Sequence, residues 1–178
     1  MANQSWWLLV YKIPSEPSRL RAAIWREVHR MGAIYLQDGV CLLPDALDGE
    51  LGIDALRERI VHMGGKAWTF RATSAALGQD QELESSFRAS LAEEVADLRD
   101  GVLALCRHLE DSQDHYDLEA GDIARSEVEL RRLRAVLQSI RCREFFKEPL
   151  LDEIEAVLYR CHALLTEGGA KDEMGDQG

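Results

Sequence analysis

The stretch Trp6-Trp7-Leu8-Leu9-Val10-Tyr11-Lys12-Ile13 decides how the first part of this chain folds. It is short, rich in aromatic and branched apolar residues, and followed by Pro14, which is typical of a β-strand. Apolar residues occupy both alternating sets of positions, whereas a strand with one face in water would alternate apolar with polar residues. The stretch therefore predicts a central strand whose two faces are both covered by other parts of the protein.

The residues that follow predict two helices, a hairpin and a final strand. Pro17 and apolar residues at steps of three or four predict an amphipathic helix that ends at Gly32. Asp38-Gly39 separates two short apolar runs and favours a tight β-hairpin. A second helix is expected to end at Gly64-Gly65, and residues 66–73 alternate as a strand does.

This order of elements predicts an α+β fold, with a ferredoxin-like βαββαβ domain at residues 1–73. In that arrangement the first and third strands lie in the middle of the sheet, and both helices cover the same sheet face. Trp6, Leu8 and Val10 lie on one face of the first strand, and Trp7, Leu9 and Tyr11 lie on the other. Because both sets are apolar, we expect residues outside the domain to bury the face that the helices leave open.

Residues 74–166 are predicted to form a C-terminal antiparallel bundle of three long helices. Apolar residues recur at steps of three and four from Asp80 to about Asp111, from Ile123 to Ile140, and from Pro149 to Leu165. The bundle would either cover the open sheet face or extend away from it to form a homodimer. Residues 167–178 show no apolar periodicity and are expected to be a disordered tail.

Composition and charge exclude several classes of protein. The chain has 178 residues, of which 46% are hydrophobic and 30% charged, as in globular proteins rather than disordered or fibrous ones. No apolar run is long enough to span a membrane and no leader pattern opens the chain, so we expect a cytoplasmic protein. Residues 1–73 carry 9 Lys+Arg and 8 Asp+Glu, whereas residues 74–178 carry 12 and 24. The first part therefore lacks the acidic excess that would repel nucleic acid.

Three arginines of the first predicted helix form a candidate phosphate-binding face. Arg19, Arg26 and Arg30 are spaced so that they lie within about 40° of one another around the helix axis. Guanidinium groups on one face suit phosphate or another oxyanion, as in contacts with the DNA backbone. The alternative is a solvated face whose arginine stems shield the edge of the core.

A second candidate basic face lies on the second long helix. It consists of Arg125, Arg132 and Arg143, of which the first two repeat the seven-residue step between Arg19 and Arg26. Acidic neighbours such as Glu129 and Glu144 can pair with these arginines. A structural role is therefore the stronger interpretation of this second face.

The sequence predicts no metal site, no cofactor and no catalytic centre. The four cysteines are too far apart for zinc ligands or a disulfide framework and are expected to be reduced: Cys41, Cys106, Cys142 and Cys161. The acidic stretch from Glu110 to Asp117 lacks the alternating acids and central glycine of an EF-hand, and is expected to be a solvated connection. No nucleophile, P-loop or dinucleotide motif occurs, so we expect no enzyme.

Three segments resemble the N-terminal domain of ChrB, the regulator of bacterial chromate-resistance operons. They are residues 7–14, the arginine-rich helix around residues 21–26, and residues 31–44, of which the hairpin at 36–40 is the most specific part. The resemblance implies a DNA-associated transcriptional regulator of a chromate-resistance, or metal-stress, operon. It also implies operator DNA as a partner and chromate or another oxyanion as an effector.

The same run is similar to the middle domain of the PaaX repressors and, more distantly, to small CRISPR-associated ferredoxin-like nucleases. Those nucleases end the first strand with a metal-binding Asp, where this chain has Lys12. The winged helix that precedes this domain in PaaX has no counterpart before Trp6, so DNA contacts are expected on another surface. The resemblance implies that full-length ChrB has a second, C-terminal chromate-resistance domain, and the segments that carry the resemblance lie outside that domain.

Two alternative functions remain open at this point. The chain could be a non-catalytic protein-interaction or dimerisation module, in which the arginines only solvate a helix. It could also be a nuclease-like relative without the metal-binding Asp. The salt dependence of DNA binding distinguishes a regulator from an interaction module, because phosphate contacts make affinity fall steeply with salt.

Overall fold

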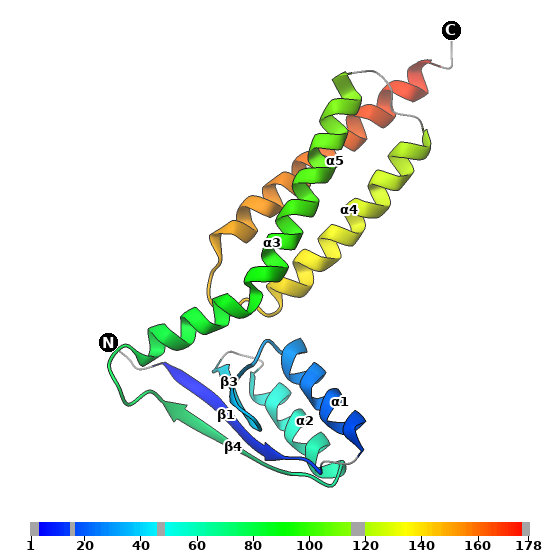
Figure 1. Ribbon diagram of the computed structural model, residues 1–178. Helices are drawn as coiled ribbons and strands as arrows, with labels where there is room; N and C mark the ends of the chain where they lie inside the picture. The colour runs from blue at the N-terminus through cyan, green and yellow to red at the C-terminus, as the bar shows by residue number, and fades with distance from the viewer. Residues whose placement is uncertain (1–3, 15–16, 46–48, 115–119, 176–178) are drawn as a thin grey trace. The chain divides into compact units, whose positions relative to one another are not determined.

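The computed structural model describes residues 4–14, 17–45, 49–114 and 120–175 (Figure 1). Its elements are, in chain order, β1 (Ser5–Lys12), α1 (Ser18–Arg30), β2 (Ile34–Gln37), β3 (Val40–Pro44), α2 (Gly49–His62), β4 (Lys66–Thr73), α3 (Gln79–Asp114), α4 (Ala120–Arg141) and α5 (Pro149–Gly175). The fold class is therefore α+β, as predicted. Two compact units make up the chain: Met1–Ser90 with Cys142–Phe146, and Leu91–Arg141 with Lys147–Gly178.

The first unit contains a four-stranded sheet with the order β2-β3-β1-β4. β1 pairs antiparallel with β3 on one side and with β4 on the other. It is thus a central strand, as its apolar residues on both faces predict. β2 pairs antiparallel with β3 and forms one edge of the sheet, and β4 forms the other.

The hairpin between β2 and β3 turns at Asp38-Gly39, as predicted. Gly39 has a φ angle of 74°, in the region that side-chain-bearing residues rarely adopt. A Cβ atom at this position would overlap the main-chain oxygen of Tyr11. The Tyr11 N–H donates to the Gly39 carbonyl oxygen over 2.7 Å. The hairpin tip is therefore held against β1, and only glycine fits there.

α1 and α2 cover one face of the sheet (Figure 1). Trp7 and Leu9 of β1 share an apolar cluster with Ile24 and Val28 of α1 and with residues of α2. Ile24 and Val28 are fully buried, four residues apart on one side of α1. The opposite side of this helix consequently faces solvent.

The second sheet face is covered fully at only one end. Trp6 is 1% exposed, and its ring stacks on Phe87 of α3 with the ring centroids 5.7 Å apart. The Trp6 indole N–H donates to Asp80 at the start of α3 over 2.9 Å. Leu8 and Val10 are half-buried. Residues beyond position 73 do bury the start of this face, but the covering is incomplete toward its other end.

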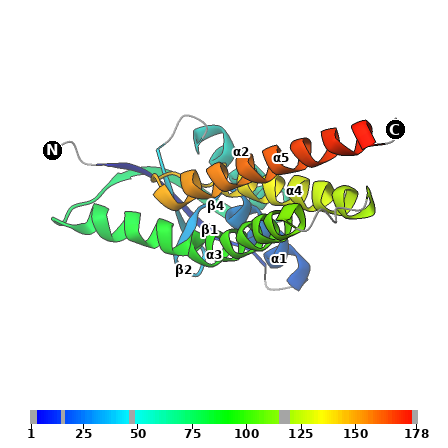
Figure 2. The same ribbon diagram turned by 90° about the horizontal axis from the view of Figure 1, so that it is seen from above.

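Three helices pack around one apolar core in the second unit (Figures 1 and 2). The core contains the apolar positions of α3 from Leu91 to Leu109, of α4 from Leu130 to Ile140, and of α5 from Leu151 to Leu165. The periodic pattern predicts most of them, but in α5 Leu151 is fully buried where the pattern predicts Leu150, which is only partly buried. Where α3 approaches α4, a Cβ atom on Gly101 would lie 3.1 Å from the Leu133 side chain, so the helices pack closely here.

Two helices extend beyond their predicted ends. α3 continues to Asp114, so the first part of the predicted acidic connection is helical, and residues 115–119 lie outside the described residues. Glu110 forms an ion pair with Arg160 of α5, with 2.6 Å between the guanidinium nitrogen and the carboxylate oxygen. This contact helps to stabilise the last turns of α3. α5 continues to Gly175, whereas the sequence predicts no regular structure after position 166. No proline interrupts this extension, so the backbone can remain helical.

Candidate functional site: a basic helix face

The solvent-facing side of α1 is the candidate nucleic-acid interface. Arg19, Arg26 and Arg30 are exposed on it, on the side of the helix away from the buried Ile24 and Val28. Within the described part of the chain, Arg19 and Arg26 form no ion pair or hydrogen bond through their side chains. Two of the three predicted guanidinium groups are therefore available to an external oxyanion.

Arg30 differs from these two because it shares a carboxylate with α2. Its guanidinium donates to Oε1 of Glu27, and Arg59 of α2 donates to Oε2 of the same carboxylate over 3.0 Å. The Arg30 side chain is 72% exposed, so water screens its ion pair. Arg59 adds a fourth cation to the interface. Sequence spacing could not reveal it, because it lies 32 positions from Glu27 on another helix.

A pocket of about 640 Å³ lies beside the start of α1. Its lining includes Arg21 and Trp25 of α1, the phenol groups of Tyr11 and Tyr35, and Asp38 of the hairpin. The two phenol oxygens are 2.9 Å apart. Burial raises the pKa of each tyrosine, so both hydroxyls stay protonated at neutral pH. The pocket thus brings a cation, a carboxylate and the two tyrosine hydroxyls together, which sequence reasoning did not do.

The second predicted basic face is not one face. Arg125 and Arg132 lie on α4, but Arg143 follows the end of that helix and belongs to the first unit. The chain leaves the helix here because Phe145 and Phe146 pack into the apolar cluster on the second sheet face. The prediction that the three arginines share a helix is therefore wrong for Arg143.

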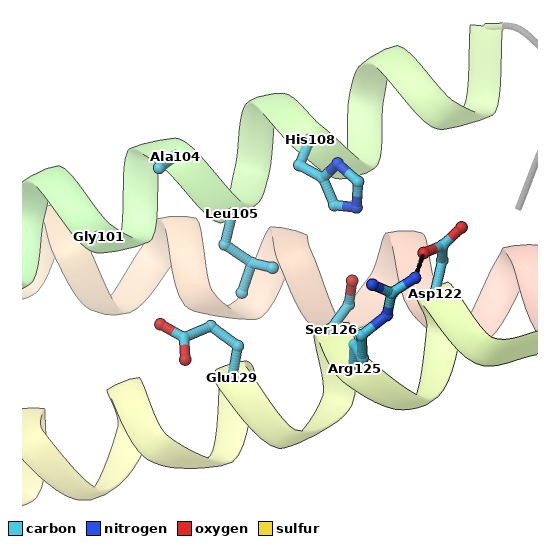
Figure 3. A pocket seen from close by; sticks show the side chains of 8 residues that line it. All are labelled: Gly101, Ala104, Leu105, His108, Asp122, Arg125, Ser126 and Glu129. Carbon is cyan, nitrogen blue, oxygen red and sulfur yellow. Dashed lines mark hydrogen bonds and ion pairs between the residues drawn. The ribbon is translucent and has the colours of Figure 1, made fainter.

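The two arginines on α4 are paired with carboxylates of their own helix. Arg132 donates two hydrogen bonds to Glu129, of 2.9 and 2.7 Å, and the Arg132 guanidinium lowers the pKa of that carboxyl. Arg125 pairs with Asp122 at the end of a pocket of about 360 Å³ between α3 and α4 (Figure 3). His108 of α3 also lines this pocket. Arg125 and Arg132 are therefore neutralised by carboxylates and are not available to an external anion.

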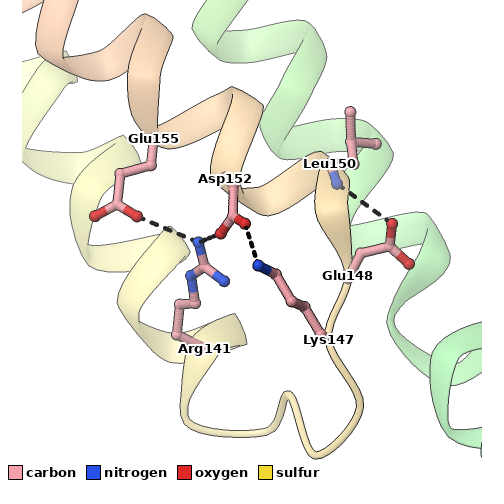
Figure 4. A network of polar contacts seen from close by, with 6 residues as sticks. All are labelled: Arg141, Lys147, Glu148, Leu150, Asp152 and Glu155. Atoms are coloured by element: carbon pink, nitrogen blue, oxygen red, sulfur yellow. Dashed lines mark hydrogen bonds and ion pairs between the residues drawn. The ribbon is translucent and has the colours of Figure 1, made fainter.

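A polar network near the start of α5 shows the same internal neutralisation (Figure 4). Arg141 at the end of α4 donates to Asp152 over 2.7 Å and to Glu155 over 3.2 Å. Lys147 contacts the other oxygen of Asp152 at 3.1 Å. Hydrogen bonding to Arg141, followed by Lys147, lowers the pKa of the Asp152 carboxyl. These cations fasten α4 to α5 and are not available to a ligand.

The four cysteines are free thiols, and three of them are buried. Burial raises the pKa of Cys41 and of Cys161 to about 12, and it also raises the pKa of Cys106. These thiols are therefore protonated at neutral pH and poor nucleophiles. Among the residues that the structure describes, no group of three or more His, Cys, Asp or Glu side chains could hold a metal ion.

No helix in the described residues is both long enough and apolar enough to cross a membrane. Residues 21–171 match the family model described as "Protein ChrB, N-terminal". The chain is also 31% identical over 85 residues to Protein ChrB of Cupriavidus metallidurans, a match that covers 48% of this chain and 25% of that protein. No solved structure matches the chain.

The family match includes most of α1 and of α5, and the whole of β2, β3, α2, β4, α3 and α4. It therefore spans the basic helix face from Arg21 onward and continues through the helical unit. The resemblance inferred from the hairpin and the arginine-rich helix is confirmed by this match. The chain belongs to the ChrB N-terminal family.

Proposed function

We propose that this chain is a DNA-associated transcriptional regulatory protein of a chromate-resistance operon, and that α1 contacts DNA phosphates through Arg19, Arg26 and Arg30. Membership of the ChrB family suggests a regulator related to chromate resistance. The observation that carries the DNA contact is the availability of Arg19 and Arg26, which have no ion-pair partner among the described residues. Elsewhere on the chain, arginines of similar spacing are neutralised by acids.

The three arginines extend over about 16 Å of helix, from the first turn of α1 to the last. They project from a helix that buried apolar residues fix against the sheet, so their positions relative to one another are set before DNA binds. Preorganisation of this kind lowers the entropy cost of binding. Glu27 partly offsets the charge of Arg30, so we expect Arg19 and Arg26 to contribute most.

The proposal includes an oxyanion effector, chromate or a chemically similar dianion, and the pocket beside α1 is where we place it. Arg21 supplies positive charge there, the paired Tyr11 and Tyr35 hydroxyls leave one O–H to donate, and Asp38 offsets part of the charge. Arg21 belongs to the same helix as the proposed DNA contacts, so an anion at this pocket could alter them directly. Replacement of Arg21 by Gln should weaken any effect of chromate or sulfate on DNA binding while leaving anion-free binding in place.

We also propose that the first unit has a ferredoxin-like fold and that the second unit is an antiparallel three-helix bundle. The element order and the central positions of β1 and β3 support a ferredoxin-like first unit, and the common core supports an antiparallel three-helix bundle. We further propose a cytoplasmic, non-catalytic homodimer. Sedimentation analysis tests the dimer, and an experimentally determined structure tests the fold.

The deciding experiment measures binding of the full chain to the DNA upstream of its operon at several salt concentrations. Three phosphate contacts predict a slope of log affinity against log salt of about −2.7, at about −0.9 per contact. The variant Arg19→Gln/Arg26→Gln/Arg30→Gln should bind more weakly, with a flatter slope. Gln keeps helix propensity, so circular dichroism should be unchanged.

The matched control is Arg125→Gln/Arg132→Gln, which removes paired arginines from α4. This variant should bind DNA as the parent does. If the triple α1 variant keeps the affinity and salt slope of the parent, α1 is only a solvated helix and the proposed contact is wrong. If the parent binds no DNA, a protein-interaction module replaces the regulatory proposal.

A further inference from the structure

The second sheet face exposes two aromatic side chains where its covering is incomplete. Trp68 and Phe70 of β4 are 51% and 50% exposed. They lie opposite Val10 and Leu8 of β1, so all four side chains are on the same sheet face as Trp6. Exposed aromatic rings of this size on adjacent same-face positions cost free energy in water and mark an interaction surface.

Two lysines stand next to this aromatic pair. Lys12 of β1 and Lys66 of β4 are directly opposite each other, and both are exposed. The alternation of each strand places them on the same face as Trp68 and Phe70. Neither lysine has an ion-pair partner among the described residues. Like charges that face each other across two strands destabilise a sheet, so this pair has a cost that an anionic ligand would offset.

The strands of the sheet lack acidic residues, which favours an anionic ligand. The chain contains 32 acidic residues, yet β1, β2, β3 and β4 contain no Asp or Glu. The face therefore offers aromatic rings and positive charge with no strand carboxylate to oppose an anion. A second copy of the chain would bring two more lysines to this small surface and supply no strand carboxylate to pair with them.

We propose that this face, defined by Lys12, Lys66, Trp68 and Phe70, binds single-stranded DNA. The two rings provide stacking platforms for bases, and the two lysines neutralise phosphates of the same strand. Positions 68 and 70 are separated by about 6.6 Å along the strand, roughly twice the 3.4 Å rise of stacked bases in a duplex. An extended single strand, whose bases are spread apart, fits this separation. In a duplex, neighbouring bases already stack on each other and cannot also stack on the two rings.

None of the four side chains offers an acceptor oxygen or nitrogen to a ribose 2′-hydroxyl. The lysines and the Trp68 indole N–H can donate to a 2′-hydroxyl, but stacking and phosphate neutralisation do not require one, and stacking on flat rings selects no particular sequence. This site differs from the arginine face of α1, which we propose for duplex backbone. The two proposals therefore fail independently of each other.

The test is fluorescence anisotropy of the full chain with a labelled oligo-dT of about 12 nucleotides, within the usual site size of single-strand binders. Parent protein should bind with a salt slope of about −1.4, from two contacts at about −0.7 each. Trp68→Ala/Phe70→Ala should weaken binding at least tenfold, because loss of one stacked base alone has about that effect. Trp68→Tyr/Phe70→Tyr should restore most of the affinity, since the rings remain.

Lys12→Gln/Lys66→Gln should also weaken binding and should flatten the salt slope toward zero. Tyr159→Ala is the matched control, because Tyr159 is an aromatic residue that is 65% exposed on α5. It should bind oligo-dT as the parent does. The triple arginine variant of α1 should do so too, and Trp68→Ala/Phe70→Ala should leave duplex binding intact.

Four results would overturn the proposal. The first is a parent chain that does not bind oligo-dT, and the second is unchanged binding by the aromatic double variant with its circular dichroism intact. The third is a parent oligomer that the aromatic double variant dissociates, since the face would then be occupied by a second copy. Oligo-rU bound at least tenfold more tightly than oligo-dT would reject the choice of DNA.

Discussion

The exposed sides of α1 and α4 carry arginines at similar spacing, but their surroundings differ. On α1, Arg19 and Arg26 have no partners in the described structure, whereas on α4 Arg125 and Arg132 each pair with a carboxylate three positions earlier. Arginine count and helical spacing are thus nearly the same on both faces. What distinguishes the two faces, among the described residues, is whether a carboxylate pairs with each guanidinium, because a paired arginine has little net charge left for an external anion.

Buried side chains hold α1 and α4 equally firmly if the two faces differ only in their ion pairs. Truncation of these side chains tests this and has the largest expected effect. Ile24→Ala in α1 and Leu133→Ala in α4 remove side chains that are 0% and 2% exposed. Each should lower the free energy of unfolding by about 2–5 kcal/mol. All four tryptophans precede position 69, so fluorescence follows the first unit, and circular dichroism follows both.

Exposed positions supply the controls for this first prediction. Val61→Ala and Leu103→Ala truncate side chains that are 49% and 42% exposed. Their unfolding free energies should stay close to that of the parent, because little buried surface is lost. A loss for Ile24→Ala no larger than that for Val61→Ala would mean that α1 is not anchored, and its arginines would not be held in one arrangement.

Removal of the acids on α4 should convert its face into one like that of α1. Asp122→Asn/Glu129→Gln frees two arginines without changing side-chain size. The salt slope for duplex binding should steepen by up to about 1.8, for two added contacts at about −0.9 each. An unchanged slope in a salt titration would show that the acidic surroundings of the helical unit, and not the local pairs, decide whether α4 binds DNA.

A smaller effect is expected for the one acid on the α1 face. Glu27→Gln releases Arg30 and Arg59, which it now bridges between α1 and α2. Duplex affinity should rise, with a slope steeper by about 0.9 if one further contact forms. The control is Glu58→Gln, which removes an exposed acid of α2 that contacts Arg57. Weaker DNA binding by Glu27→Gln would indicate that Glu27 positions Arg30 for binding.

The smallest expected effect concerns Asp80, which joins the start of α3 to β1. Hydrogen bonds from Ser74 and then Trp6 hold the pKa of this carboxyl below its usual range. A lowered folded pKa contributes stability that is fully present above the unfolded value of about 3.9 and is lost as the pH falls through the folded pKa. Asp80→Asn should therefore unfold more easily than the parent at neutral pH.

The difference between parent and Asp80→Asn should vanish in acid, where the parent carboxyl is protonated. Thermal unfolding followed by tryptophan fluorescence from neutral to strongly acidic pH measures this convergence. Asp100→Asn, at an exposed site on α3, should parallel the parent throughout. A constant difference at every pH would show that the carboxylate charge is not what holds the start of α3 on the sheet.

The local features of the fold could be predicted from sequence because neighbouring residues cause them. Apolar residues on both sides of β1, the glycine at the hairpin and the periodic leucines of α3 each specify their own element. The packing of Phe87 and Phe146 on Trp6 could not be predicted, since it joins segments that are far apart in the chain. Alternation in β4 likewise did not reveal that Trp68 and Phe70 face outward.

The candidate site was predictable to the same extent. Spacing alone placed Arg19, Arg26 and Arg30 on one side of a helix. Whether each guanidinium is available depends on contacts between helices, such as the one from Arg59 to Glu27. The prediction that Arg143 lies on the second long helix was wrong because α4 ends two residues earlier. Phe145 and Phe146 then pack into the apolar cluster of the first unit.

Gly39 has a consequence for the mutational tolerance of the hairpin. In a saturation mutagenesis library of position 39, selection for a folded chain should remove every variant except glycine. The obstruction is the main-chain oxygen of Tyr11, which is present whatever amino acid occupies position 11. No second substitution at Tyr11 can therefore rescue a variant of Gly39, and a screen for suppressors should recover only revertants or changes that rebuild the turn.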